Sequence, residues 1–359
     1  MSRRADEQSA FAGKPGYDPI LSASDLIAEA WDAGGLYQVG SFPNWNRWSE
    51  WNGRYRDDLR SFLKGDAGFA RAAAMRIIGS PDLYPPDERA SASINFITCM
   101  MASPCMIFIP TMKNTTKRTA GITPTVPTIT AAGTVEKRAI PPTRSALPSL
   151  PHDTKCLCCT DVQPRNPMFL AGDEFGNTKH GNNNTYCQDN ETSWINWKLL
   201  EKNHDLFEFF KFMIRFRKDH PVISRKLPNA VCGMENIHTH NIDARDVTIP
   251  RDAHTFAVSF AGYDKSKGTD DLIYIVINAY WEDVTVTLPE LARPGAWYLC
   301  VNTFGDGNGR YFYEKGQEPR IEHDFCMRPD PLPSLPAATI KIYIWDKFFL
   351  SLSERNGVF

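Results

Sequence analysis

The sequence predicts a protein of two parts, in which an α/β part is followed by an all-β part. A short apolar run, Leu26-Ile-Ala28, is typical of a core strand in the first part. Residues 205–218 carry apolar side chains at helical spacing and stop before His220-Pro221, which predicts a helix at the end of that part. Further segments, bounded by Gly, Pro and Asp turns, predict the strands of the second part: 255–260, 272–277, 284–288 and 297–301.

One carboxylic acid, Glu29, stands where the first predicted strand ends and a tryptophan-rich loop begins. Flat aromatic rings suit the flat faces of sugars, so this combination indicates a carbohydrate site with Glu29 as a proton donor. The composition alone also allows an ordinary strand-end acid beside tryptophans of the core. The aromatic residues of this stretch are Trp31, Tyr37, Trp45, Trp48, Trp51 and Tyr55.

Several motifs follow one another in a characteristic order. They include Ala28-Glu-Ala-Trp-Asp32, Trp45-Asn-Arg-Trp-Ser-Glu-Trp-Asn-Gly53, Pro167-Met-Phe-Leu-Ala-Gly-Asp-Glu-Phe-Gly176 and His180-Gly-Asn-Asn-Asn-Thr-Tyr-Cys-Gln-Asp-Asn190. In this order they closely resemble the isoamylase and glycogen-debranching branch of the α-amylase superfamily, glycoside hydrolase family 13. The resemblance implies hydrolysis of α-1,6 branch linkages in glycogen or a related α-glucan. It also implies a partial (β/α)8 TIM barrel, the C-terminal half, followed by a small β-sandwich domain.

The same resemblance implies roles for single residues. Glu29 takes the place of the acid/base of a retaining glycosidase, which needs a second carboxyl group about 5 Å away as nucleophile. Asp173 and Glu174 follow a predicted eighth barrel strand at 168–171 and would support the loop geometry near the site. Substrate contacts are expected from Trp31, Tyr37, Trp45, Asn182, Asn183, Asn184, Tyr186 and Asp189, with Tyr37 and Trp45 as stacking rings and turn bracing as the alternative role of the polar residues.

The two companion acids of this chemistry are not in the sequence. The family nucleophile stands in an Arg-Phe-Asp context, a string that occurs nowhere in the chain. The third acid belongs to a Cys-His-Asp-Gly run, whereas here Cys99 is followed by Met-Met-Ala-Ser-Pro-Cys-Met-Ile107. Read one nucleotide late, the codons CAT GAT GGC TTC ACC CTG TAT GAT encode that observed string. We therefore interpret the chain as a fragment with a frameshift and without useful turnover; the alternative is a non-catalytic glucan-binding or assembly-partner protein.

Residues 100–165 are interpreted as read out of frame and disordered. This window has one aromatic residue, Phe108, and eight Lys or Arg against three acids. It lacks the apolar periodicity needed to offset an ordering entropy of roughly 1–2 kcal/mol per residue. A similar slip is inferred after Pro329, because the prolines at 331, 333 and 336 would interrupt a closing strand. The predicted division is 1–17 non-matching, 18–99 barrel strands 5 to 7, 100–165 out of frame, 166–240 end of the barrel, 241–329 β-sandwich and 330–359 a tail foreign to the fold.

Composition and charge argue against two classes of partner. A net charge of −2 and a pI near 6.5 give no case for nucleic acid or an anionic membrane, and no apolar run reaches spanning length. Nine cysteines without a signal peptide indicate reduced thiols and a cytoplasmic protein. No cofactor or metal is required by the chemistry, and loop or core roles are favoured over metal binding for His238-Thr-His240 and for Cys156, Cys158 and Cys159.

Overall fold

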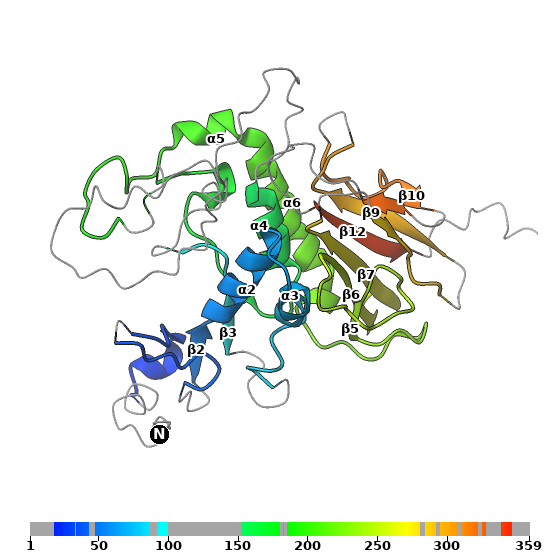
Figure 1. The fold of residues 1–359 in the computed structure, drawn as a ribbon, viewed down its shortest axis with the longest axis horizontal. Coiled ribbons are helices and arrows are strands. Elements are labelled where there is room, and N and C mark those ends of the chain that lie inside the picture. The colour runs from blue at the N-terminus through cyan, green and yellow to red at the C-terminus, as the bar shows by residue number, and fades with distance from the viewer. Residues whose placement is uncertain are drawn as a thin grey trace, which may run out of the picture.

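The computed structural model contains a small parallel sheet, a group of helices and a larger antiparallel sheet (Figure 1). The residues that it describes are 18–32, 34–42, 47–85, 92–99, 152–179, 182, 185–280, 284–291, 295–306, 310–321, 325–327 and 339–346.

The parallel sheet has four strands that neighbour one another in chain order. They are β1 (Leu26–Ala28), β2 (Trp48–Trp51), β3 (Ser93–Asn95) and β4 (Asn166–Pro167). Each adjacent pair is parallel, which requires a crossover between strands and is the arrangement of an α/β protein. The strand predicted at 26–28 is confirmed, whereas the strand predicted at 168–171 is displaced and ends at Pro167. The described residues form an open sheet, not a closed barrel.

The helices are assigned as follows. The α-helices are α2 (Gly53–Leu63), α3 (Ala70–Ile77), α4 (His152–Asp161), α5 (Lys198–Lys202) and α6 (His204–Asp219), and the 3-10 turns are η1 (Leu21–Ala23), η4 (Asp173–Phe175) and η5 (Pro221–Ile223). The helix predicted at 205–218 is confirmed as α6. Asn52 begins α2, because its side-chain oxygen accepts a hydrogen bond of 2.9 Å from the Tyr55 amide. None of the helices in the described part of the chain is long and apolar enough to cross a membrane.

The antiparallel sheet has six strands in the order β10-β9-β12-β7-β6-β5. All of the strands predicted between 255 and 301 are confirmed. The bounds are β5 (Ile237–His240), β6 (Thr255–Asp264), β7 (Thr269–Asn278), β9 (Ala296–Asn302), β10 (Arg320–Ile321) and β12 (Thr339–Asp346), with a separate pair formed by β8 (Val284–Val286) and β11 (Phe325–Met327).

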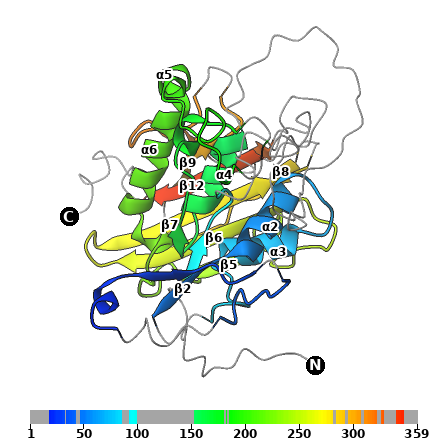
Figure 2. The ribbon, with the colours of Figure 1, turned by 90° about the vertical axis from the view of Figure 1, so that its left-hand side faces the viewer.

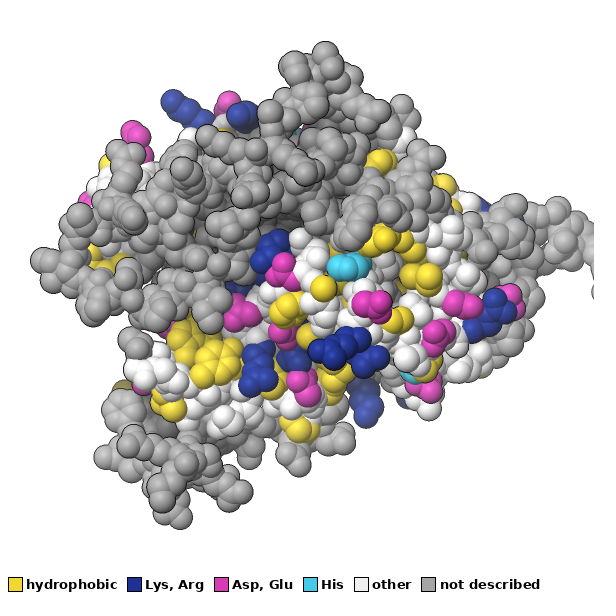
Figure 3. All heavy atoms as spheres, in the orientation of Figure 1, with side chains coloured by type: hydrophobic (Ala, Val, Ile, Leu, Met, Phe, Trp, Pro, Cys, Tyr) yellow, Lys and Arg dark blue, Asp and Glu magenta, His cyan; other side chains and the backbone are white. Residues whose placement is uncertain are grey.

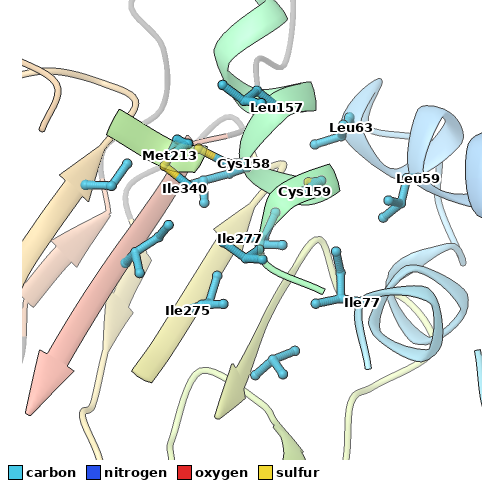
Figure 4. Close-up of a cluster of buried hydrophobic side chains, with 14 of the residues drawn as sticks. Leu59, Leu63, Ile77, Leu157, Cys158, Cys159, Met213, Ile275, Ile277 and Ile340 are labelled. Atoms are coloured by element: carbon cyan, nitrogen blue, oxygen red, sulfur yellow. The ribbon is translucent and has the colours of Figure 1, made fainter. Parts of the chain in front are cut away.

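Helices α2, α3, α4 and α6 lie between the parallel strands and one face of the antiparallel sheet (Figures 1 and 2). Alternate residues of the long strands, such as Ile275 and Ile277, face these helices in one continuous core. Figure 4 shows Leu59 and Ile77 of α2 and α3 in this core together with Ile277 of β7. The opposite face of the sheet buries a second cluster that includes Tyr274, Val276 and Val286. One core therefore joins the α/β part to the β part.

The end of the segment predicted to be disordered is folded, which corrects that prediction for residues 152–165. Helix α4 buries Leu157, Cys158 and Cys159 in the shared core (Figure 4). The Tyr55 hydroxyl donates a hydrogen bond of 2.6 Å to the Cys159 carbonyl oxygen. The physical reason is that a short apolar run of this window packs against residues of other helices, although the average composition of the window is polar. Residues 100–151 of that prediction lie outside the described residues.

The C-terminal segment also corrects its prediction. Residues 330–359 were predicted to be foreign to the fold, but residues 339–346 form β12, which pairs with both β7 and β9 in the middle of the sheet. The three prolines precede this strand, so they remove none of its ladder hydrogen bonds. Alternation over 340–344 places Ile340 and Ile342 on the helix-facing side and Tyr343 on the other. The β part accordingly includes residues 237–240 and 339–346 beyond its predicted bounds.

Candidate active site

Residues that follow the four parallel strands share one edge of the sheet. Glu29 follows β1, Asn52 follows β2, Phe96 follows β3 and Met168 follows β4. Because all four strands run in one direction, their carboxyl ends meet at this edge, where α/β proteins place their sites. Glu29 therefore stands at the edge where chemistry is expected.

Glu29 is exposed to solvent, and its carboxyl group is tuned by its neighbours. Desolvation raises the pKa of Glu29 above its ordinary value, while a hydrogen bond from the Trp31 side chain and the positive charge of Arg56 act in the opposite direction. The net upward direction keeps a larger fraction of the carboxyl group protonated near neutral pH than for a free glutamate. This protonation suits a general acid.

Trp31 and Tyr37 form a pair of stacked rings beside Glu29, with centroids 6.1 Å apart and ring planes inclined by 18°. The Asp32 carboxylate fixes the intervening turn, since it accepts hydrogen bonds from the Gly34 and Leu36 amides at 2.7 and 3.0 Å. Tyr37 remains 44% exposed, and desolvation is the largest cause that raises its pKa to about 12. The turn chemistry therefore presents one open phenol ring that is neutral at physiological pH.

Gly53, the first residue of α2, provides the space that this ring pair needs. A Cβ atom at Gly53 would lie 2.8 Å from the Tyr37 hydroxyl oxygen and 3.3 Å from the Trp31 ring. The absence of a side chain at this position thus lets the helix start approach both rings.

Arg56 covers the same aromatic cluster from α2. Its guanidinium carbon lies 5.9 Å from the Trp31 ring centroid and 5.8 Å from the Phe96 ring centroid, within the range of a cation–π contact. The Asp57 carboxylate holds the guanidinium at 2.7 and 3.1 Å. Figure 3 shows hydrophobic side chains beside Lys and Arg side chains on the visible surface near β2. Sequence reasoning missed Arg56; its position one helical turn after the Asn52 cap was the available signal.

Asp173 and Glu174 brace the turn that follows β4. Thr98 donates a hydrogen bond to the Asp173 carboxylate, which also accepts one of 3.2 Å from the Leu170 amide. Glu174 accepts a hydrogen bond of 2.8 Å from the Gly172 amide. Desolvation is the main cause that raises the pKa of Asp173 to about 6. These contacts lie within the turn itself, and the support of loop geometry near a catalytic site stays a prediction for both acids.

The remaining predicted contact residues are spread over the next loop. Asn182 is buried. Its backbone N–H donates a hydrogen bond of 3.0 Å to the Lys179 carbonyl oxygen, which is a turn contact. Tyr186 is 73% exposed, and Asp189 accepts a hydrogen bond of 2.8 Å from the Trp194 indole. The structure brings Glu29, Trp31 and Tyr37 together. Trp45, Asn183 and Asn184 lie outside the described residues.

The two histidines considered as metal ligands lie on strand β5. The imidazole nitrogens of His240 contact the Ala244 carbonyl oxygen at 2.8 Å and the Ser259 hydroxyl at 2.9 Å. Desolvation is the largest cause that lowers the pKa of His240. His238 Nδ1 lies 2.9 Å from the Thr239 carbonyl oxygen. Among the described residues, no group of three or more His, Cys, Asp or Glu side chains is arranged to hold a metal ion.

The protonation of Asp173 gives a testable pH dependence. Its folded pKa of about 6 exceeds the ordinary value of 3.8, so its contribution favours the folded state at low pH and is lost as pH rises through about 6. The difference corresponds to about 3 kcal/mol as an upper scale. Asp173→Asn keeps an acceptor oxygen but cannot ionise, so the decrease in unfolding free energy between pH 4.5 and 7.5 should shrink by about 1–3 kcal/mol in urea titrations.

The exposed Asp252→Asn is the matched control for that measurement, since it removes one carboxylate without touching the turn. A decrease of the same size in wild type, Asp173→Asn and Asp252→Asn would show that Asp173 carries none of the pH dependence.

No protein-family model matches the chain. Among curated proteins, the chain is 37% identical to isoamylase SU1, chloroplastic, of Zea mays over 303 residues, which cover 80% of this chain and 36% of the maize protein. It is 35% identical to isoamylase 1, chloroplastic, of Arabidopsis thaliana over 302 residues, with the same shares of 80% and 36%. It is 37% identical to the glycogen operon protein GlgX homolog of Mycobacterium tuberculosis over 237 residues, which cover 62% of this chain and 31% of that protein.

Solved structures of pullulanases share the fold. The pullulanase of Bacillus acidopullulyticus gives a TM-score of 0.57 at 17% identity and covers 88% of this chain and 34% of that one. A pullulanase of Anoxybacillus complexed with maltotetraose gives 0.57 at 13% identity and covers 89% and 39%. The chain spans about a third of the length of the curated relatives that it matches. Over the part that they share, the chain is similar in sequence to plant isoamylases and to glycogen operon GlgX homologs.

Proposed function

We propose that this chain is the part of an α-1,6-acting glycoside hydrolase that supplies the proton donor and binds α-glucan. The arrangement of Glu29 with the Trp31–Tyr37 ring pair and Arg56 at the carboxyl edge of the parallel sheet carries the proposal. In this proposal β1 to β4 are the last four strands of a (β/α)8 barrel, and the antiparallel strands belong to its β-sandwich domain. Their chain order, parallel direction and likeness to pullulanases support this assignment.

The chemistry assigned to Glu29 is proton transfer. The protonated carboxyl group gives its proton to the glycosidic oxygen as the bond to the anomeric carbon breaks, and the resulting carboxylate then activates water. The Trp31–Tyr37 pair would hold a sugar face beside it, and Arg56 would stabilise the carboxylate that remains. A second carboxylate must attack the anomeric carbon in this double displacement.

Neither the Arg-Phe-Asp nor the Cys-His-Asp-Gly string occurs in this sequence. We therefore propose that the chain by itself binds branched α-glucan but does not hydrolyse it at a useful rate, because covalent catalysis and charge stabilisation need both missing acids. The same observation favours a second candidate, a non-catalytic glucan-binding or assembly-partner protein.

The partner class and the compartment follow from the same features. We propose a neutral α-glucan such as glycogen or branched maltodextrin as the ligand, without nucleic acid or membrane. Six cysteines in the described part of the chain are free thiols, which fits a reducing compartment such as the cytoplasm: Cys99, Cys158, Cys159, Cys187, Cys232 and Cys300.

Incubation with glycogen tests the proposal directly. In native gels that contain glycogen, the wild-type chain should be retarded, and Tyr37→Ala should lose most of that retardation because the open stacking ring is gone. Reducing ends released from glycogen should not exceed those of Glu29→Gln, which cannot donate a proton. Trp45→Ala extends the gel test to the other predicted stacking ring.

The outcomes distinguish hydrolysis, binding without hydrolysis, and the absence of binding. Release of reducing ends by wild type but not by Glu29→Gln would show that the chain is an active hydrolase and that the proposed inactivity is wrong. Retardation without release agrees with the proposal. Migration unchanged by glycogen, from a chain with a folded circular dichroism spectrum, would remove the glucan-binding function from both candidates.

A further inference from the structure

Three large aromatic side chains are exposed on the loop between η4 and α5. Tyr186 is 73% exposed, Trp194 55% and Trp197 65%. Large rings are usually buried on average, so three open rings within twelve residues of one loop mark a surface built for contact. Figure 1 shows this loop and α5 on the side of the molecule away from the antiparallel sheet.

The two tryptophans are held in place. The Trp194 indole donates a hydrogen bond of 2.8 Å to the Asp189 carboxylate, and its amide donates one of 3.0 Å to the Asn190 carbonyl oxygen. The Trp197 ring lies 5.5 Å from the Phe175 ring, at an inclination of 37°. A ring fixed before binding loses little conformational entropy when a ligand covers it. Both tryptophan rings are therefore preorganised for ligand binding.

The loop is tied to the acidic turn at the carboxyl edge of the sheet. The Asn196 amide donates a hydrogen bond of 3.0 Å to the Asn177 side-chain oxygen, and the Asn177 amide donates one of 2.9 Å to the Gly172 carbonyl oxygen. Gly172 has a φ of +97°, and a Cβ atom there would lie 2.6 Å from the Asn177 Cβ. The close approach of Gly172 and Asn177 thus connects the exposed rings to the turn of Asp173.

The polar groups around the rings indicate the chemistry of the ligand. The Asn190 amide group contacts the Gln188 side-chain oxygen at 3.5 Å, and its own oxygen accepts a hydrogen bond of 2.9 Å from the Thr192 amide. Exposed rings with amide side chains between them match a ligand with flat apolar faces and hydroxyl edges.

We propose that Trp194 and Trp197, which lie far from Glu29 in the sequence, form a platform that binds an α-glucan chain. Tyr186 is the third ring of this platform. This inference rests on the proposed function for the identity of the ligand. It adds binding residues that the sequence motifs did not single out, and it assigns Asp189 a positioning role through the Trp194 indole.

Binding of maltoheptaose measured by isothermal titration calorimetry tests the platform. Each of Trp194→Ala and Trp197→Ala should weaken the Kd about tenfold, which is about 1.4 kcal/mol. Trp194→Phe, which keeps a flat ring, should stay within about threefold of wild type. Val247→Ala is the matched control, because it truncates a side chain of similar exposure, 54%, on the loop after β5. Asp189→Asn should weaken binding less than Trp194→Ala, since the amide oxygen still accepts from the indole.

The results that overturn the inference differ from those that overturn the function. Wild-type affinity in both Trp→Ala variants, or protection of Trp194 from acrylamide quenching in the free chain, would remove the platform and leave the function of Glu29 untouched. If the wild-type chain binds cellohexaose but no maltoheptaose, both the α-glucan function and the platform as an α-glucan site fail. Unchanged maltoheptaose affinity in Glu29→Gln supports a platform that binds the ligand without the acid.

Discussion

Replacing Arg217 with Met should lower the free energy of unfolding by about 3–5 kcal/mol, because three hydrogen bonds from a charged group are lost. The guanidinium of Arg217 donates hydrogen bonds to three carbonyl oxygens at the end of α4, those of Asp161, Gln163 and Arg165, at 2.5, 2.6 and 2.7 Å. Met fills a similar volume but leaves these acceptors without their donor. Urea unfolding followed by tryptophan fluorescence measures the loss.

The pH dependence of this loss has a predicted sign. Desolvation is the largest cause that raises the pKa of Asp161 to about 7, and Arg217 acts to lower it. Because the pKa of Asp161 is raised in the folded state, its contribution to stability is lost as pH rises through about 7. Without Arg217, the Asp161 carboxylate that forms at higher pH also lacks a positive charge that stabilises it. The deficit of Arg217→Met should therefore be larger at pH 8 than at pH 5.

Two variants serve as controls for Arg217→Met. Lys218→Met removes the next positive charge along α6, which is exposed, and should change stability by less than about 0.5 kcal/mol. Arg217→Lys keeps the charge but not the planar fork, so an intermediate loss is expected. Equal stabilities for Arg217→Met and Lys218→Met would mean that residues 152–165 are not packed on α6. That result would support the prediction that these residues are disordered.

The parts of the fold that could be predicted from the sequence are those with a regular apolar pattern. The strand at 26–28 and the helix at 205–218 follow from short-range periodicity, and β6 and β7 follow from apolar runs between turns. Strand β4 was misplaced because Met168-Phe-Leu170 is apolar, yet the ladder ends at Pro167 and the chain turns toward Asp173. The apolar side chains of residues 168–170 indicate burial, but they do not determine which groups form hydrogen bonds with the backbone of these residues.

Helix α4 could not be predicted from composition, because its stability comes from residues far away in the chain. Tyr55 and Arg217 bind its backbone carbonyl oxygens, and the cavity that Leu157 fills is formed by other helices. A window average over 66 residues conceals a run of seven buried positions, 157–163. Long-range hydrogen bonds of this kind leave no local signal in a sequence.

The candidate site shows a similar division. Glu29, Trp31 and Tyr37 lie within nine residues of the chain, and their proximity follows from a local structure, the turn at Asp32. Arg56 reaches the site from α2 through packing against Phe96, a residue forty positions later, so the motif alone did not single it out. Residues that share a loop are predicted well, and residues that meet across strands are not.

Ile342→Pro should prevent the β part from folding, with a loss of more than about 3 kcal/mol. Ile342 is fully buried in β12 and pairs with Ile275 of β7 on one side and Val301 of β9 on the other. Proline removes the amide donor and forces its ring into a central strand, where no solvent can satisfy the acceptor left behind. Circular dichroism and the midpoint of urea unfolding measure the effect.

The conservative Ile342→Val isolates the backbone contribution, because it retains the amide and removes one buried methylene. It should cost about 0.5–1.5 kcal/mol, as such truncations do in well-packed cores. Since Ile342 belongs to the same core as Leu59 and Met213, a central break in β12 should also loosen the helices that hold the parallel strands. Hydrogen exchange should then show reduced protection in β7, β9 and α6 together. If Ile342→Pro unfolds at the same urea concentration as Ile342→Val, β12 is not part of the sheet, and the tail is foreign to the fold as its prolines first suggested.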